Sequence, residues 1–139
     1  MNILAIRLKP EQDLKQSLRN FVEQNNIQVG FILTAVGSLK KATLRFANQD
    51  KSQVFDERFE IVSLVGTLSS QGIHLHISLA DKNGKTIGGH LLDGCTIYTT
   101  AEILIGTSED FIFLRTVDEK TGYKELEIQH KQQTTNNKL

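Results

Sequence analysis

From residue 27 onward the sequence consists almost entirely of short apolar-rich runs separated by turn-forming residues. The runs are rich in Ile, Val, Leu, Phe and Thr, which are residue types that favour β-strands. They read IQVGFILTAVGSL, KATLRFA, RFEIVSLVGTLS, IHLHISLA, IGGHLL, TIYTTAEILIG, FIFLRTV and ELEIQ. Several such strands must bury their apolar sides together, so strands are expected to dominate this part of the chain.

The segment before residue 27 predicts one strand and one long helix. Residues 3–8, ILAIRL, read as a short opening strand. Pro10 then suits a first helical turn, and Asp13 suits the positive end of a helix dipole. The apolar residues that follow have helical spacing and form one stripe: Leu14, Leu18, Phe21 and Val22. The helix is expected to end near Asn25. We therefore expect the α+β class, with one long N-terminal helix.

Length and composition favour a single domain. The chain has 139 residues, and a domain of about this length buries roughly 70% of the surface that its unfolded chain exposes. No Pro-rich or Gly/Ser-rich linker divides it. The last residues, KQQTTNNKL, are polar. We expect one domain over residues 1–130 and a flexible polar tail over residues 131–139.

Charge and targeting patterns indicate which partners and which cellular compartment to expect. Sixteen Lys and Arg balance sixteen Asp and Glu, so nucleic acid or an anionic membrane would need a local patch to bind. The single cysteine, Cys95, cannot form an internal disulfide, and the N-terminus has no signal-peptide pattern. All apolar runs are shorter than the roughly 20 residues that span a bilayer. A cytoplasmic protein without a membrane span is expected.

Three of the four histidines gather in the segment GIHLHISLADKNGKTIGGHLL, residues 72–92. Within residues 73–79 apolar residues alternate with His74 and His76, so a strand there directs both imidazoles away from the core. The following Asp81-Lys82-Asn83-Gly84 has Asp at the first position of a type I turn and Gly where a left-handed residue is needed. This pattern predicts a three-residue loop.

The length of this loop decides whether His90 joins the other two histidines. A two-residue Asn-Gly loop would turn His90 to the opposite face of the sheet. A three-residue loop pairs His76 with His90 and His74 with Leu92, with neighbouring Cβ atoms about 5 Å apart. We therefore expect the three imidazoles to share one face.

Two interpretations of this histidine cluster remain open. Imidazole nitrogens bind zinc, and three of them leave a fourth position for water or substrate. The alternative is that His74, His76 and His90 are ordinary polar residues on an exposed strand face. Gly88 and Gly89 favour a functional site, because glycines inside a strand often mark a close approach of another backbone.

Further candidates for chemistry are few. Asp93 and Glu102 are weak candidates for acid–base catalysis beside a metal, although surface carboxylates are the simpler interpretation. Cys95 has no basic neighbour in sequence, which favours a structural thiol over a nucleophile. No serine elbow, P-loop or dinucleotide fingerprint is present, so no nucleotide cofactor is expected.

The chain resembles the plants-and-prokaryotes conserved (PPC) domain family along nearly its whole length. The resemblance implies an α+β fold around a largely antiparallel sheet, assembly as a homotrimer, and a metal, commonly zinc, on His74, His76 and His90 near the subunit interface. The matching segments are RLKPEQDLKQSLRNFVEQNNIQVGFILTAVGSL (7–39), RFEIVSLVGTLS (58–69), HLHISLAD (74–81), GGHLLDGCTIYTTAEILI (88–105) and FLRTVDEKTGYKELEI (113–128).

Plant relatives in this family place the domain after an AT-hook and use a Gly-Arg-Phe-Glu-Ile-Leu segment to contact other nuclear proteins. The equivalent here is Glu57-Arg58-Phe59-Glu60-Ile61-Val62, which departs at its first and last positions. Arg58, Phe59 and Glu60 are therefore the interaction candidates that the resemblance implies. No Arg-Gly-Arg run that could enter a minor groove is present.

Three functions follow as hypotheses. The first is a stand-alone, homotrimeric, zinc-binding interaction module. The second is a DNA-associated regulator, because prokaryotic relatives often carry a DNA-binding label, and Lys40, Lys41 and Arg45 are weak candidates for a basic patch. The third is a metal-dependent hydrolase or lyase, which would use the open fourth position of a three-histidine site.

Overall fold

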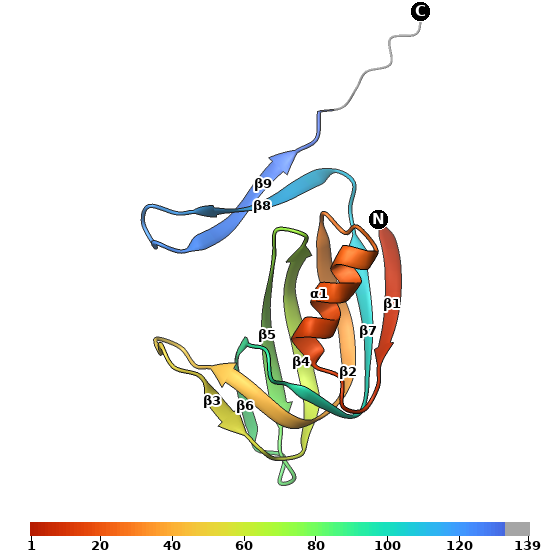
Figure 1. Ribbon diagram of the computed structural model, residues 1–139, viewed down its shortest axis with the longest axis vertical. Helices are drawn as coiled ribbons and strands as arrows, with labels where there is room; N and C mark the ends of the chain where they lie inside the picture. The colour runs from red at the N-terminus through yellow and green to blue at the C-terminus, as the bar shows by residue number, and fades with distance from the viewer. Residues whose placement is uncertain (133–139) are drawn as a thin grey trace, which may run out of the picture.

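Strand β2 (Gly30–Arg45) organises the sheet, because it pairs with four other strands. In the computed structural model, which describes residues 1–132, a seven-stranded sheet runs in the order β1-β7-β2-β4-β5-β6, with β3 also paired to β2 (Figure 1). All of its pairings are antiparallel. The remaining elements are β1 (Asn2–Leu8), α1 (Leu14–Gln24), β3 (Gln53–Phe55), β4 (Phe59–Ser69), β5 (Gly72–Ala80), β6 (Thr86–Leu91), β7 (Thr96–Thr107), β8 (Phe111–Val117) and β9 (Lys124–His130).

The sheet curls into a barrel-like ring. Strand β2 pairs with β4, β4 with β5, β5 with β6, and β6 returns to β2. Helix α1 lies against one face of the sheet (Figure 1) and contributes its apolar stripe to the core. The core is almost wholly aliphatic, and its largest fully buried side chains include Leu18, Leu44, Leu75, Leu91 and Ile103.

The expected α+β class with a long N-terminal helix is wrong. Helix α1 has 11 residues, about three turns, and nearly all other regular structure is strand, so the domain is β-rich and barrel-like. The helix is short because its N-cap is Asp13, which follows Pro10 by three residues. The Asp13 carboxylate accepts a hydrogen bond from the Gln16 amide at 2.9 Å. Pro10 lies in the preceding turn rather than in the first helical turn. The apolar stripe itself was predicted correctly, with Leu14, Leu18 and Val22 buried.

The last two strands form a separate two-stranded sheet, the β8–β9 hairpin, which projects from the barrel (Figure 1). Arg115 on β8 connects it to the barrel, since its guanidinium donates to Thr67 Oγ1 on β4 at 2.9 Å. The predicted polar tail, residues 131–139, lies outside the described residues except for its first two positions. Within residues 1–132, no helix has the length and apolar character needed to cross a bilayer.

Candidate metal centre

The turn between β5 and β6 sets the register of the histidines. The Asp81 amide donates to Lys85 O and the Gly84 amide donates to Asp81 O, both at 2.9 Å. Asp81 Oδ1 also accepts from the amides of Asn83 and Lys85. Gly84 has a φ of +79°, which favours glycine. The predicted three-residue loop with a glycine bulge is therefore confirmed.

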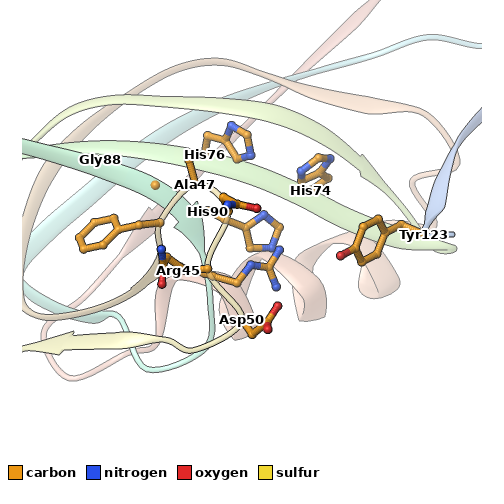
Figure 2. A pocket seen from close by; sticks show the side chains of 12 residues that line it. Arg45, Ala47, Asp50, His74, His76, Gly88, His90 and Tyr123 are labelled. Atoms are coloured by element: carbon orange, nitrogen blue, oxygen red, sulfur yellow. The ribbon is translucent and has the colours of Figure 1, made fainter. Parts of the chain in front are cut away.

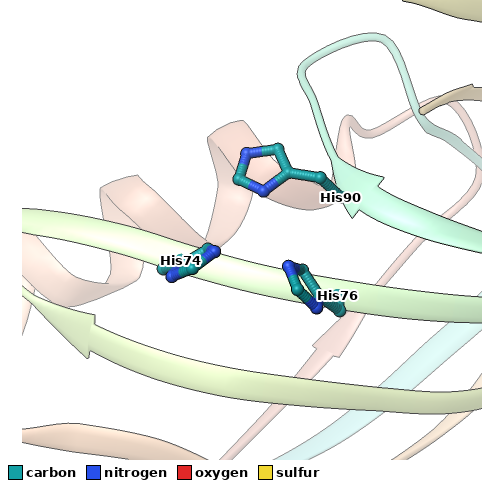
Figure 3. A group of neighbouring side chains, drawn as sticks. All are labelled: His74, His76 and His90. Atoms are coloured by element: carbon teal, nitrogen blue, oxygen red, sulfur yellow. The ribbon is translucent and has the colours of Figure 1, made fainter. Parts of the chain in front are cut away.

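The three histidines converge as this register requires. His76 lies directly opposite His90, and His74 lies two residues before His76 on β5, on the same face of the sheet. The ring centroids are 5.0 to 5.7 Å apart, and one nitrogen from each ring lies within 4.8 Å of the others (Figure 3). The ladder between β5 and β6 ends at this pair, and the Leu92 amide instead donates to Thr43 O on β2 at 3.2 Å. The expected pairing of His74 with Leu92 is therefore not formed, because Leu92 bonds to β2 instead.

Two glycines allow β6 to approach strands on both sides. A Cβ on Gly88 would lie 2.9 Å from Ile77 O on β5, and a Cβ on Gly89 would lie 2.8 Å from Arg45 O on β2. The close backbone approach that these glycines predicted is confirmed. It brings Arg45 into register with His90, so a side chain of β2 reaches the histidine cluster.

The surroundings favour neutral imidazoles in this cluster. Burial, followed by the positive charges of Arg45 and Lys15, lowers the pKa of His90 to about 4. Burial also lowers the pKa of His74, and the charges of His76 and Arg115 act in the same direction. A neutral imidazole is the form that binds a metal, so protons compete little for these two nitrogens near neutral pH.

A cavity of about 690 Å³ opens over the histidines. One wall contains Arg45 at the end of β2 and Asp50 in the loop that follows, while Tyr123 approaches from the β8–β9 hairpin (Figure 2). A second cavity of about 400 Å³ adjoins it beside His74 and His90. It shares Tyr123 with the first cavity and adds three side chains from the hairpin region: Arg115, Lys124 and Glu125.

Most of these wall residues were not identified from the sequence. Asp50, Arg115, Tyr123 and Glu125 lie far from residues 72–92 in the chain, and no local motif marks them. Their approach depends on how the loop after β2 and the hairpin fold back over β5. The one available signal was the polar Gln-Asp-Lys-Ser segment between two strand-like runs, which predicts a loop but not its position.

The two weak acid–base candidates do not line either cavity. Asp93 forms an exposed ion pair with Arg19 at 3.1 Å. Glu102 is exposed on β7, opposite Arg7 of β1, and β2 and β4 separate its strand from β5. Carboxylates near the histidines are instead those of Asp50 and Glu125.

The three cations considered for DNA binding do not form one patch. Lys40 pairs with the carboxylate of Glu11. Lys41 is half-buried and lies opposite Thr96 of β7. Arg45 lines the histidine cavity. Only Arg45 is therefore placed beside the candidate centre.

The segment that the family resemblance suggested for interactions is partly in the core. Phe59 is 4% exposed and packs edge-on to Phe55, so it supports the barrel. Arg58 stacks on Tyr98, with its guanidinium carbon 4.3 Å from the ring centroid, and Glu60 is exposed. The accessible part of this segment is thus Arg58 and Glu60, which line a small cavity of about 190 Å³.

Cys95 is fully buried, and the geometry fits the structural interpretation of its thiol. Its sulfur accepts from the Thr43 amide and donates to Thr43 O. Burial raises the pKa of the Cys95 thiol to about 11, so the thiolate is scarce at neutral pH.

The histidine cluster fits a tetrahedral metal ion. Zinc binds imidazole nitrogen at about 2.0–2.1 Å, which sets three tetrahedral ligand atoms roughly 3.3 Å apart. The nitrogens here lie within 4.8 Å of one another, a gap that rotation of the imidazole side chains can close. Three nitrogen donors from the paired strands β5 and β6 would leave a fourth position facing the cavity.

Comparisons with known sequences and structures agree with this architecture. A bifunctional protein GlmU from Synechococcus sp. (strain JA-3-3Ab) is 50% identical over 129 residues, which is 93% of this chain. The chain spans about a fifth of the length of that relative, 21%. A hypothetical protein from Salmonella cholerae-suis superposes with a TM-score of 0.92 at 37% identity, covering 94% of this chain and 95% of that chain.

Two further structures are similar over most of their length. A metal-containing protein from Archaeoglobus fulgidus has a TM-score of 0.78 at 25% identity, covering 91% of this chain and 94% of that chain. A Bacteroides thetaiotaomicron protein named as a candidate DNA-binding protein has a TM-score of 0.82 at 25% identity, covering 91% of each. The Plants and Prokaryotes Conserved (PCC) domain model matches residues 1–109. The chain belongs to the Plants and Prokaryotes Conserved domain family.

Proposed function

We propose that this protein is a zinc-binding interaction module that assembles as a homotrimer. The observation that carries the proposal is the convergence of His74, His76 and His90 on one face of β5 and β6, with ligand nitrogens within 4.8 Å of one another. Zinc accepts an all-nitrogen, tetrahedral donor set more readily than calcium or magnesium, which prefer oxygen ligands. The name of the similar Archaeoglobus protein, a metal-containing protein, also supports a metal.

The outer face of the sheet supports assembly with other copies. Val36 on β2, Val65 on β4 and Leu104 on β7 are 58%, 55% and 39% exposed, although each belongs to a strand whose alternate residues form the core. Val65 lies directly opposite His76, so this apolar face adjoins the histidine cluster. An exposed apolar face of this kind is typical of an interaction surface. A subunit seated there would lie beside the metal.

Elemental analysis of protein purified without a histidine tag tests the metal. We expect about one zinc per chain in the wild type and almost none in His76→Ala, because two imidazoles hold zinc much more weakly than three. His130→Ala is the matched control, since His130 lies on β9 and packs against Phe111. This control should keep its zinc.

Light scattering on the same three samples tests the assembly. A trimer mass for wild type supports the proposal, and the mass of His76→Ala shows whether the metal contributes to the interface. Wild-type protein that remains metal-free after incubation with zinc and removal of the excess would refute the metal centre.

A DNA-associated role is the second candidate, and the name of the similar Bacteroides protein favours it. The cations near the histidine cavity, Arg45, Arg115 and Lys124, are the side chains that phosphates could reach. Binding through phosphates weakens steeply with salt because counterions are released. Absence of any electrophoretic shift of a DNA duplex at low salt would exclude this role.

A further inference from the structure

We propose that the histidine cavity binds a small oxyanion, a carboxylate or a phosphate, that completes the coordination of the metal and is recognised by Arg45. The inference rests on the proposed metal centre and adds the chemical class of its ligand. Three histidines leave the fourth position of a tetrahedral ion directed into the cavity. An oxyanion there would contact the metal through one oxygen and Arg45 through another.

The position of Arg45 carries the inference. Its backbone pairs with His90 across the β2–β6 ladder, and its side chain lines both cavities. Its guanidinium lies beside the His90 ring in Figure 2. Within residues 1–132, the ion pairs are Arg19 with Asp93 and Lys40 with Glu11, so Arg45 has no carboxylate partner. The planar guanidinium therefore has donors available, and two parallel N–H groups match the geometry of a carboxylate or phosphate.

The charges around the cavities favour an anion. Three cationic side chains line them, Arg45, Arg115 and Lys124, against two anionic ones, Asp50 and Glu125. A divalent ion on neutral imidazoles would add two further positive charges. A centre with this excess of positive charge attracts a negative ligand more strongly than water.

The size and walls of the site favour a small molecule. The cavity volume of about 690 Å³ is within the range of small-molecule sites. Tyr123 forms its far wall (Figure 2) and is 71% exposed. Tyr123 also lies beyond residues 1–109, the part that the family model matches. The aromatic ring is suited to contact the organic part of a carboxylate or phosphate ester.

Cobalt-loaded protein tests the inference, because the visible absorption of Co²⁺ reports its coordination without any assay of activity. Wild-type protein is titrated separately with inorganic phosphate, with acetate and with chloride. We expect phosphate or acetate to change the spectrum saturably, with chloride far weaker. The tighter of the two oxyanions identifies the class of the natural ligand.

Arg45→Gln removes the charge while keeping a hydrogen-bonding side chain of similar reach. We expect this variant to bind cobalt as wild type does but to bind the oxyanion roughly tenfold to a hundredfold more weakly, as for loss of a charge-assisted hydrogen bond. The matched control is Arg7→Gln, an exposed arginine on β1 outside both cavities. It should retain wild-type oxyanion affinity.

The outcomes separate the two proposals. If the wild type binds no cobalt, the metal centre fails and this inference fails with it. If cobalt binds but no oxyanion changes its spectrum, or if Arg45→Gln binds the oxyanion as tightly as wild type, the metal centre stands and the anion site is refuted. A spectrum that responds to a DNA duplex but to neither small oxyanion would also refute it.

Discussion

His90 is held neutral near physiological pH, because burial and the charges of Arg45 and Lys15 lower its pKa to about 4. In the unfolded chain this imidazole regains its ordinary pKa of 6.5. Between those values the unfolded state binds more protons than the folded state, so the free energy of unfolding decreases as the pH falls from about 6.5 toward 4. Protonation in the same range would also remove one of the three imidazoles proposed to bind the metal.

Removing His90 should therefore flatten part of the pH dependence of stability. We expect the loss of unfolding free energy between about pH 7 and pH 4.5, measured by urea denaturation of metal-free protein, to be smaller in His90→Gln than in wild type. His130→Gln controls for loss of an imidazole elsewhere, on β9. An identical pH dependence in wild type and His90→Gln would contradict the pKa shift.

At the scale of elements, strand β6 positions the site. It is six residues long and pairs with both β5 and β2, and Gly89 allows this because a Cβ there would meet Arg45 O. Backbone cannot yield as a flexible side chain does. The position of His90 on β6 therefore depends on the absence of a Cβ atom at Gly89.

Gly89→Ala should displace β6 and weaken the histidine site. We expect a loss of roughly 1–3 kcal/mol of stability, the usual cost of overpacking, together with weaker zinc binding in a competitive chelator titration. Gly72→Ala is the control, because its Cβ would lie 3.3 Å from the flexible Arg115 side chain. Equal zinc affinity in the two variants would show that β6 tolerates the methyl group.

The elements were predicted with uneven success, for physical reasons. The β5–β6 register followed from the sequence because the Asp81–Gly84 turn has strong local preferences. Strand β2 was divided into two runs, since its register shifts against β7 interrupt the alternation of apolar residues. The short β3 was missed, because three residues carry too little pattern. The helix was placed correctly by its stripe but made too long.

At the scale of the whole molecule, we expect the exposed apolar face to hold the subunits of the proposed homotrimer together. Val65→Asp places a charge on that face beside the histidine cluster, and burying an unpaired charge is costly. We expect light scattering to show a mass close to that of a single chain. Val117→Asp is the control, because Val117 is 64% exposed on β8 of the hairpin. An unchanged mass for Val65→Asp would place the interface elsewhere.

The histidine cluster and the walls of its cavity differ in how far the sequence could predict them. His74, His76 and His90 come from two strands joined by one short turn, so local rules sufficed. Arg45 reaches them through closure of the ring, and Tyr123 through the folding back of the hairpin. Such contacts depend on the global path of the chain, which no short segment encodes.

The ring of strands closes through two residue pairs between β2 and β6, Leu44 with Leu91 and Arg45 with His90. Arg45 and His90, which form the second of these pairs, also line the histidine cavity. A ligand bound by His90 of β6, by the two histidines of β5 and by Arg45 of β2 would link three strands. Occupancy of the site would then stabilise the closed barrel, and the amides along the seam between β2 and β6 would exchange with solvent more slowly when the ligand is bound.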